Sequence, residues 1–165
     1  MISIPLNLRG IVAVSIGLVV LMILTIRLNS KEKSDYNRTT GQITYLDKEL
    51  GTLPVRHLGK YRYLEVDGYS FPFEIFVGNE SGDFKPKYEQ IDNLKKGDTI
   101  SVFYYETENT QSEGINRFIQ FVDKDGQSFF ERGDSNKVMG IVIIGLSIIL
   151  TISGFVLWKL KKIPF

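Results

Sequence analysis

Two long apolar runs bracket a polar middle in this sequence. Residues 138–158 read VMGIVIIGLSIILTISGFVLW without a charge, and a helix of that length, at about 1.5 Å per residue, spans the ~30 Å hydrocarbon layer of a bilayer. A soluble chain of 165 residues has little room to bury such a run in a core. The earlier run, residues 11–27, is shorter, but the stem of Arg27 extends its usable length. The pattern predicts two transmembrane helices.

The earlier run has an alternative interpretation as a cleaved signal peptide with Arg9 as its basic region. No small-x-small cleavage site follows it, because Arg27 and Leu28 stand where small residues are needed. We therefore favour an uncleaved anchor.

Small residues at helical spacing predict close contact between membrane helices. Ala13 and Gly17 are four apart in the first run, as are Ser147 and Thr151 in the second. Such residues let two backbones approach in lipid. The pattern leaves open whether the contact lies within one chain or between chains.

The polar middle reads as β-structure. Alternating or β-branched stretches predict about six short strands, at residues 40–46, 61–66, 69–77, 99–105, 115–122 and 128–131. Asp67-Gly68 predicts a two-residue hairpin turn, and residues 123–127 predict a second hairpin. Pro72 cannot donate a ladder hydrogen bond, which indicates an edge or a bulge.

The segments between these strands predict one short helix and several loops. Tyr88, Ile91 and Leu94 are three apart, which predicts one or two helical turns within residues 87–96. The polar composition of residues 48–59, 78–86 and 106–114 predicts loops, the last of them mobile.

The predicted fold class is therefore membrane α plus soluble all-β. Two transmembrane helices flank a small β-barrel or curled antiparallel sheet of about six strands with one short helix. The predicted domains are a cytoplasmic N-terminus (1–10), transmembrane helix 1 (11–27), an extracytoplasmic β domain (31–137), transmembrane helix 2 (138–158) and a cytoplasmic basic tail (159–165).

The orientation follows from the distribution of charge. All 19 acidic residues lie within residues 31–137. The short tails carry Arg9, Lys159, Lys161 and Lys162 next to the apolar runs, and basic residues in short tails govern orientation more than those in long loops. The sequence therefore predicts a two-pass protein of the cytoplasmic (inner) membrane with both termini cytoplasmic.

Candidate chemistry in the middle is sparse. The chain has no cysteine, which excludes disulfides, a thiolate nucleophile and cysteine-held zinc, and its one histidine, His57, makes no credible triad. Glu106 and Glu108 are better interpreted as a solvated loop than as a cation site. We predict no catalytic residue, no metal and no cofactor.

A cluster of aromatic residues offers two interpretations, as a stacking platform for nucleic acid or as cross-strand core pairs. The middle is net acidic, so the electrostatic attraction for phosphate is missing, and we predict core pairs and no nucleic-acid partner. The residues are Tyr61, Tyr63, Tyr69, Phe71 and Phe73.

Three motifs in this order resemble a family of small, mostly bacterial two-pass membrane proteins of unknown function. They are an opening TG-x-[IV] strand, a Y-x-Y-x-x-V-[DN]-G-x-x-[FY] hairpin and an L-x-x-G-D-x-[IV]-x-V-x-Y segment, which here begin at Thr40, Tyr61 and Leu94. The resemblance covers residues 39–158 and implies an OB-like β domain between the helices, with no catalytic residue to carry over. The chain departs from the pattern by an insertion at residues 76–90 and a further hairpin near Lys124.

The function predicted from these features is a non-enzymatic, membrane-anchored β domain that binds a protein or envelope component at the outer face of the cytoplasmic membrane. The expected partners are the lipid bilayer and a protein partner or a second copy through the helices. The loops 48–59, 78–86 and 106–114 are the expected contact surfaces. The alternatives are an accessory subunit of a larger membrane complex and a hydrolase with a scattered carboxylate site, for which two facing carboxylates are expected.

Overall fold

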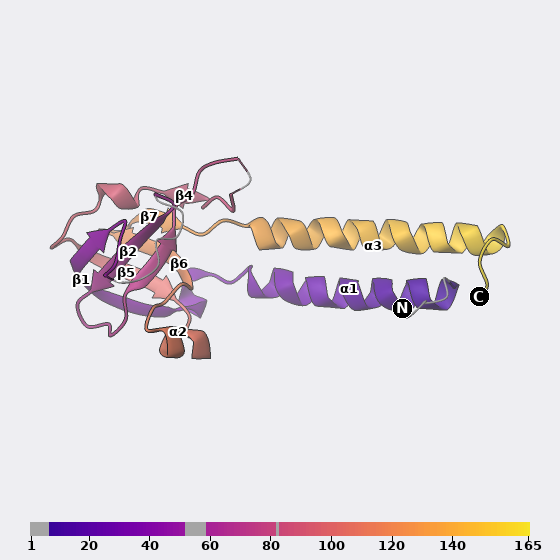
Figure 1. The fold of residues 1–165 in the computed structure, drawn as a ribbon, viewed down its shortest axis with the longest axis horizontal. Helices are drawn as coiled ribbons and strands as arrows, with labels where there is room; N and C mark the ends of the chain where they lie inside the picture. The colour runs from indigo at the N-terminus through magenta and orange to yellow at the C-terminus, as the bar shows by residue number, and fades with distance from the viewer. Residues whose placement is uncertain (1–6, 52–58, 82) are drawn as a thin grey trace. The chain divides into compact units, whose positions relative to one another are not determined.

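The computed structural model describes residues 7–51, 59–81 and 83–165 (Figure 1). The chain divides into two units, a helical one made of residues 1–30 and 135–165 and a sheet unit of residues 31–134. We describe each unit by itself.

The helical unit contains two long helices, α1 (Leu8–Leu28) and α3 (Ser135–Lys159) (Figure 1). Both extend past the predicted spans of residues 11–27 and 138–158. The earlier start of α1 has a local cause, since Asn7 Oδ1 accepts a hydrogen bond from the Gly10 amide at 2.7 Å and caps the helix. By length and composition both helices are able to cross a membrane.

The two helices pack against each other in opposite directions. A Cβ added to Gly140 would lie 2.9 Å from Ile26 Cγ1, and one added to Gly154 would lie 3.0 Å from Ile11 Cγ2. Ser147, midway between the two glycines, is 3% exposed. Small residues at a spacing of seven therefore bring the backbone of α3 close to α1.

The contact between helices that the small residues predict occurs within one chain, but only part of the predicted set makes it. Ser147 lies in the contact, whereas Ala13 and Gly17 face outward, and no atom lies within 4 Å of a Cβ built on Gly17. The small residue of α1 that is buried instead is Ser15.

The sheet unit holds a seven-stranded sheet in the order β3-β2-β1-β5-β6-β7-β4, with every neighbouring pair antiparallel. The sheet is open, so of the two predicted forms the closed barrel is not found. The strands are β1 (Asn37–Asp47), β2 (Tyr61–Val66), β3 (Phe73–Phe76), β4 (Tyr88–Glu89), β5 (Thr99–Tyr104), β6 (Ile119–Lys124) and β7 (Gln127–Glu131).

Strand β1 is the centre of the sheet because it pairs with two neighbours in succession. Its first half pairs with β5 and its second half with β2, with a shift of register between Ile43 and Tyr45. Gly41 precedes this point, and a Cβ there would lie 2.2 Å from the Asp67 carbonyl oxygen. Glycine is thus required where β1 passes the turn after β2, because there is no room for a Cβ atom.

The core lies on one face of the sheet. Val102 of β5 and Val122 of β6 are paired and fully buried, and Phe73 and Ile75 of β3 are at most 1% exposed. Because side chains alternate, the neighbours of these residues along each strand face the other way.

The hairpin predicted around Asp67-Gly68 forms, because β2 and β3 pair antiparallel from Tyr61 with Phe76 to Leu64 with Phe73, but its connection is longer than predicted. The Tyr69 amide donates to the Val66 carbonyl oxygen at 3.2 Å, but β3 starts at Phe73, so the two-residue connection was wrong. Pro72 has no amide for the ladder; instead its carbonyl accepts from the Asn116 amide at 2.8 Å.

The hairpin predicted at residues 123–127 is confirmed. Lys124 pairs with Gln127, which leaves Asp125 and Gly126 as a two-residue turn with φ angles of 52° and 77°. Positive φ at both positions is the geometry that matches the twist of the flanking strands.

Two other segments differ from their predictions. Residues 87–96 hold the short strand β4 and a single 3₁₀ turn, η2 (Ile91–Asn93), which raises the strand count from about six to seven. Residues 106–114, predicted as a mobile loop, contain helix α2 (Glu108–Glu113). That helix ends on Gly114 at φ 64°, and Thr110 is 1% exposed, so packing rather than composition determines this segment.

Substituting Gly140 tests the helix contact. Gly140→Leu overpacks the contact with Ile26, and we expect it to lower the free energy of unfolding by about 1–3 kcal/mol. The measurement is thermal unfolding of the full chain in detergent, followed by circular dichroism. Gly145→Leu is the matched control, since nothing lies within 4 Å of its added Cβ. Equal effects of the two substitutions would contradict the packing.

Candidate functional site

The polar face of the sheet carries two rows of side chains across β1, β5 and β6. Thr40 pairs with Ser101, which pairs with Asp123. In the next row, Arg38 pairs with Phe103. These residues alternate with the core residues of the same strands, so the register places them on the side away from the core.

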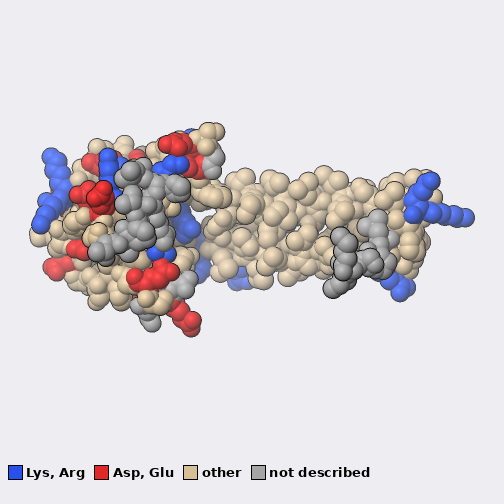
Figure 2. All heavy atoms as spheres, viewed as in Figure 1, with Lys and Arg blue, Asp and Glu red and all other residues tan. Residues whose placement is uncertain are grey.

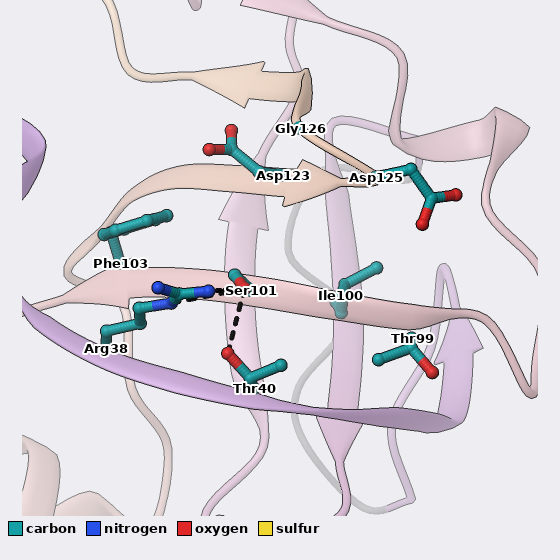
Figure 3. Close-up of a pocket in the computed structure, with 9 residues that line it drawn as sticks. All are labelled: Arg38, Thr40, Thr99, Ile100, Ser101, Phe103, Asp123, Asp125 and Gly126. Atoms are coloured by element: carbon teal, nitrogen blue, oxygen red, sulfur yellow. Dashed lines mark hydrogen bonds between the residues drawn. The ribbon is translucent and has the colours of Figure 1, made fainter.

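These rows form a hollow of about 380 Å³ (Figure 3). That volume is in the range of small-molecule sites. Its lining is Arg38, Thr40, Thr99, Ile100, Ser101, Phe103, Asp123, Asp125 and Gly126.

Arg38 is the principal cation of the hollow. Its Nη2 donates to Ser101 Oγ at 2.8 Å, and the Ser101 and Thr40 hydroxyls lie 2.9 Å apart (Figure 3). The guanidinium also lies 5.6 Å from the centre of the Phe103 ring. Among the described residues it forms no ion pair with a carboxylate, so its remaining N–H groups are available to a ligand.

The two carboxylates of the hollow differ in environment. Asp123 accepts two hydrogen bonds from Lys33 Nζ, at 2.8 and 2.7 Å, so the charge of the lysine compensates that of the carboxylate. Asp125 lies in the exposed turn, and the two carboxylates point away from each other (Figure 3). The facing pair that a carboxylate hydrolase requires is not formed at this site.

A further ion pair joins residues adjacent to the hollow. Lys124 Nζ lies 2.8 Å from Asp98 Oδ1, and Asp98 Oδ2 accepts from the Lys95 amide at 2.9 Å. The hydrogen bond from Lys124, followed by the one from the Lys95 amide, holds the pKa of the Asp98 carboxyl below its ordinary value of 3.8. The Gly-Asp motif at residues 97–98 thus serves to fix the start of β5.

Of the acidic and histidine candidates from the sequence, the structure describes the two acidic ones, Glu106 and Glu108. His57 lies outside the described residues. Glu106 Oε1 accepts from the Tyr69 hydroxyl at 3.3 Å, and Glu108 begins α2. Within the described part of the chain, no three His, Cys, Asp or Glu side chains are grouped to hold a metal ion.

The aromatic residues considered as a stacking platform lie mainly in the core. Tyr63 is 3% exposed and Phe73 is fully buried, with the Tyr69 ring stacked on Phe73 at 4.5 Å. Burial raises the pKa of Tyr69 to about 12, although a hydrogen bond from Asn116 opposes the rise. Tyr61 and Phe71 are half-buried, so the interpretation as core pairs fits the set better than a platform does.

The loops expected to make contacts are partly ordered by ion pairs. Lys60 Nζ lies 2.9 Å from Asp83 and 3.0 Å from Glu80, which restrains residues 78–86. Of residues 48–59, only 48–51 and 59 are described.

Sequence reasoning missed the hollow itself. The predicted first strand began at Thr40 and so left out Arg38. The available signal was the alternation of Arg38, Thr40 and Gln42 along that strand, but the pairing with β5 could be known only from the register.

Comparison of the chain with protein-family models, with curated proteins and with solved structures finds no match in any of the three. The resemblance proposed from the motifs is therefore neither supported nor contradicted by relatives.

Replacing Asp98 tests the ion pair through pH. A lowered native pKa gives stability that is present above about 3.8, the unfolded value, and is lost as the pH falls through the native value. Asp98→Asn keeps an acceptor for the Lys95 amide but removes the charge. We expect it to lower the free energy of unfolding at about pH 7 and to have little effect at about pH 3.

The measurement is urea unfolding of the full chain at both pH values. Asp67→Asn, at an exposed turn position, is the control and should show no such difference. An Asp98→Asn effect that is the same at both pH values would show that the ion pair contributes nothing.

Proposed function

We propose that this chain is a two-pass protein of the cytoplasmic membrane whose β unit, at the outer face, binds an envelope component without catalysis. The observation that carries the proposal is the exposure of the apolar side chains on both long helices. Ile16 is 58% exposed and Ile149 is 60% exposed, whereas the central helix of a soluble core would bury such residues. Lipid is the solvent that such surfaces fit.

The distribution of charge supports the proposed orientation. The acidic residues all belong to the sheet unit. The charged residues at the ends of the helices near Arg9 and Lys159 are all basic (Figure 2). Short basic tails stay on the cytoplasmic side, while a loop as long as residues 31–134 translocates largely regardless of its charge.

The topology supports an OB-like assignment of the β unit, in agreement with the resemblance to bacterial two-pass proteins. Strands β3, β2, β1, β5 and β6 follow one another in the sheet. A parallel bridge connects Phe73, in β3, with Asn116, which lies just before β6. That bridge curls the sheet back toward its first edge, as in a partly open Greek-key barrel.

The hollow on the polar face supports a binding role and indicates the chemistry of the ligand. It presents a guanidinium (Arg38), hydroxyls (Thr40, Ser101), a carboxylate (Asp125) and an aromatic ring (Phe103). This mixture of donors and acceptors suits a hydroxyl-rich, glycan-like molecule. Asp123 is already paired with Lys33, which leaves Asp125 as the carboxylate of the hollow that a bound hydroxyl can contact.

One observation favours a second role, as an accessory subunit of a larger membrane complex. Gly17 and Gly145 are exposed, and no atom lies within 4 Å of a Cβ built on either one, so another helix could approach α1 or α3 closely there. Size analysis after detergent extraction distinguishes the roles, because a lone monomer or homodimer counts against the subunit.

The absence of cysteine from the chain allows a clean test of the topology. We expect Lys96→Cys, in the sheet unit, to react with an impermeant maleimide on intact cells. Lys162→Cys, in the tail, should react only after the cells are permeabilised. The unmodified chain is the control and should not react. Release of the protein from membranes by alkaline carbonate would contradict the anchor, and equal labelling of both variants would contradict the orientation.

The ligand class is tested by titration of the full chain in nanodiscs with a galactose oligosaccharide and its galacturonate counterpart. We expect at least one of the two sugars to shift the NMR signals of Arg38 and Ser101. Arg38→Ala should weaken that binding by about tenfold, the loss typical of a charged hydrogen bond. Lys96→Ala should leave it unchanged. No shift with either sugar, or unchanged affinity of Arg38→Ala, would contradict the proposed class.

A further inference from the structure

The segment after α3 folds back onto the start of α1. The Leu8 amide donates to the Pro164 carbonyl oxygen at 3.0 Å. Ile163 is 9% exposed and packs with Leu8 and Ile11. The Arg9 guanidinium lies 4.5 Å from the centre of the Phe165 ring. Residues 160–165 are thus a fixed part of the helical unit, which we call the tail cap.

The backbone of the tail cap holds a lysine where glycine is usual. The Lys162 amide donates to the Leu157 carbonyl and the Lys161 amide to the Trp158 carbonyl, both at 2.9 Å. This is the hydrogen-bond pattern of a helix end whose next residue is left-handed, and that residue, Lys161, has φ 56°. A lysine is less favourable than a glycine in this conformation, so the charged side chain at position 161 has a conformational cost.

The tail cap gathers basic side chains that no acidic residue of the same unit neutralises. Residues 1–30 and 135–165 contain no Asp or Glu. Arg9, Lys159, Lys161 and Lys162 are exposed, and Figure 2 shows basic side chains and no acidic ones at this end of the helices. The ring centres of Trp158 and Phe165 lie 5.6 Å apart, and the amphipathic ring of tryptophan favours the headgroup level of a bilayer.

We propose that the tail cap binds the phosphate of an anionic phospholipid headgroup. The Arg9 fork matches phosphate oxygens, and Lys159, Lys161 and Lys162 add point charges at the same end of the helical unit. The indole of Trp158 holds this end at the depth where headgroups lie. This inference rests on the membrane anchoring proposed above, but on different residues from the glycan site.

Trp158 is the single tryptophan of the chain and therefore reports on the lipid beside it. The test places the full chain in phosphatidylcholine vesicles that contain a minor share of either brominated phosphatidylglycerol or brominated phosphatidylcholine. We expect the brominated anionic lipid to be enriched about fivefold beside Trp158, as one basic residue achieves at an anionic surface. High salt should reduce the enrichment.

Variants separate specific binding from general attraction. Lys161→Gly removes one charge while suiting the left-handed backbone, so the fold of the tail cap is kept. Combined with Arg9→Gln, Lys159→Gln and Lys162→Gln, it should abolish the preferential quenching. Arg27→Gln with Lys137→Gln removes basic residues near the opposite helix ends and should leave the quenching unchanged.

The outcomes distinguish this inference from the proposed function. Equal quenching by the two lipids, or a preference that survives the combined substitution of Arg9 and the three lysines, overturns the phosphate site but leaves the anchor intact. No quenching by either lipid overturns both, because Trp158 would then lie outside the bilayer.

Discussion

The sheet unit depends on one strand that pairs with different partners along its length. The first half of β1 bonds to β5 and its second half to β2, so the two parts of the sheet share a single backbone. The register shifts between Ile43 and Tyr45, and shortly before this point Gly41 lets β1 pass close to the Asp67 carbonyl oxygen. A two-sided role of this kind fixes the register of both halves at once.

The register of β1, β5 and β6 connects the core to the candidate site. Because side chains alternate, the register that buries Val102 and Val122 also aligns Thr40, Ser101 and Asp123 on the opposite face. The hollow is thus a consequence of the packing on the other side. Apart from Asp125 and Gly126 of the β6–β7 turn, its lining residues belong to strands, which suits a site that must hold its donors in place.

The sequence predicted the elements of this fold better than their connections. The apolar runs identified both long helices, and Asp125-Gly126 gave a turn of the expected geometry. The hairpin around Asp67-Gly68 has a longer connection than predicted because its second strand starts only at Phe73, after Pro72. Helix α2 was missed because its residues are polar, although Thr110 is buried. Arg38 gained significance only through Ser101, 63 residues away, a pairing that local pattern does not encode.

The outer strands of the open sheet have a consequence for how copies of the protein behave when crowded in two dimensions. Strand β4 spans only Tyr88–Glu89, and the backbone beside β3 is occupied, since the Glu74 amide donates to the Asn116 carbonyl at 2.7 Å. Neither border offers a long row of unsatisfied amides and carbonyls to a neighbouring molecule. The edges of the sheet are therefore poorly suited to pairing between neighbouring copies, and crowding does not favour fibrils built from such pairs.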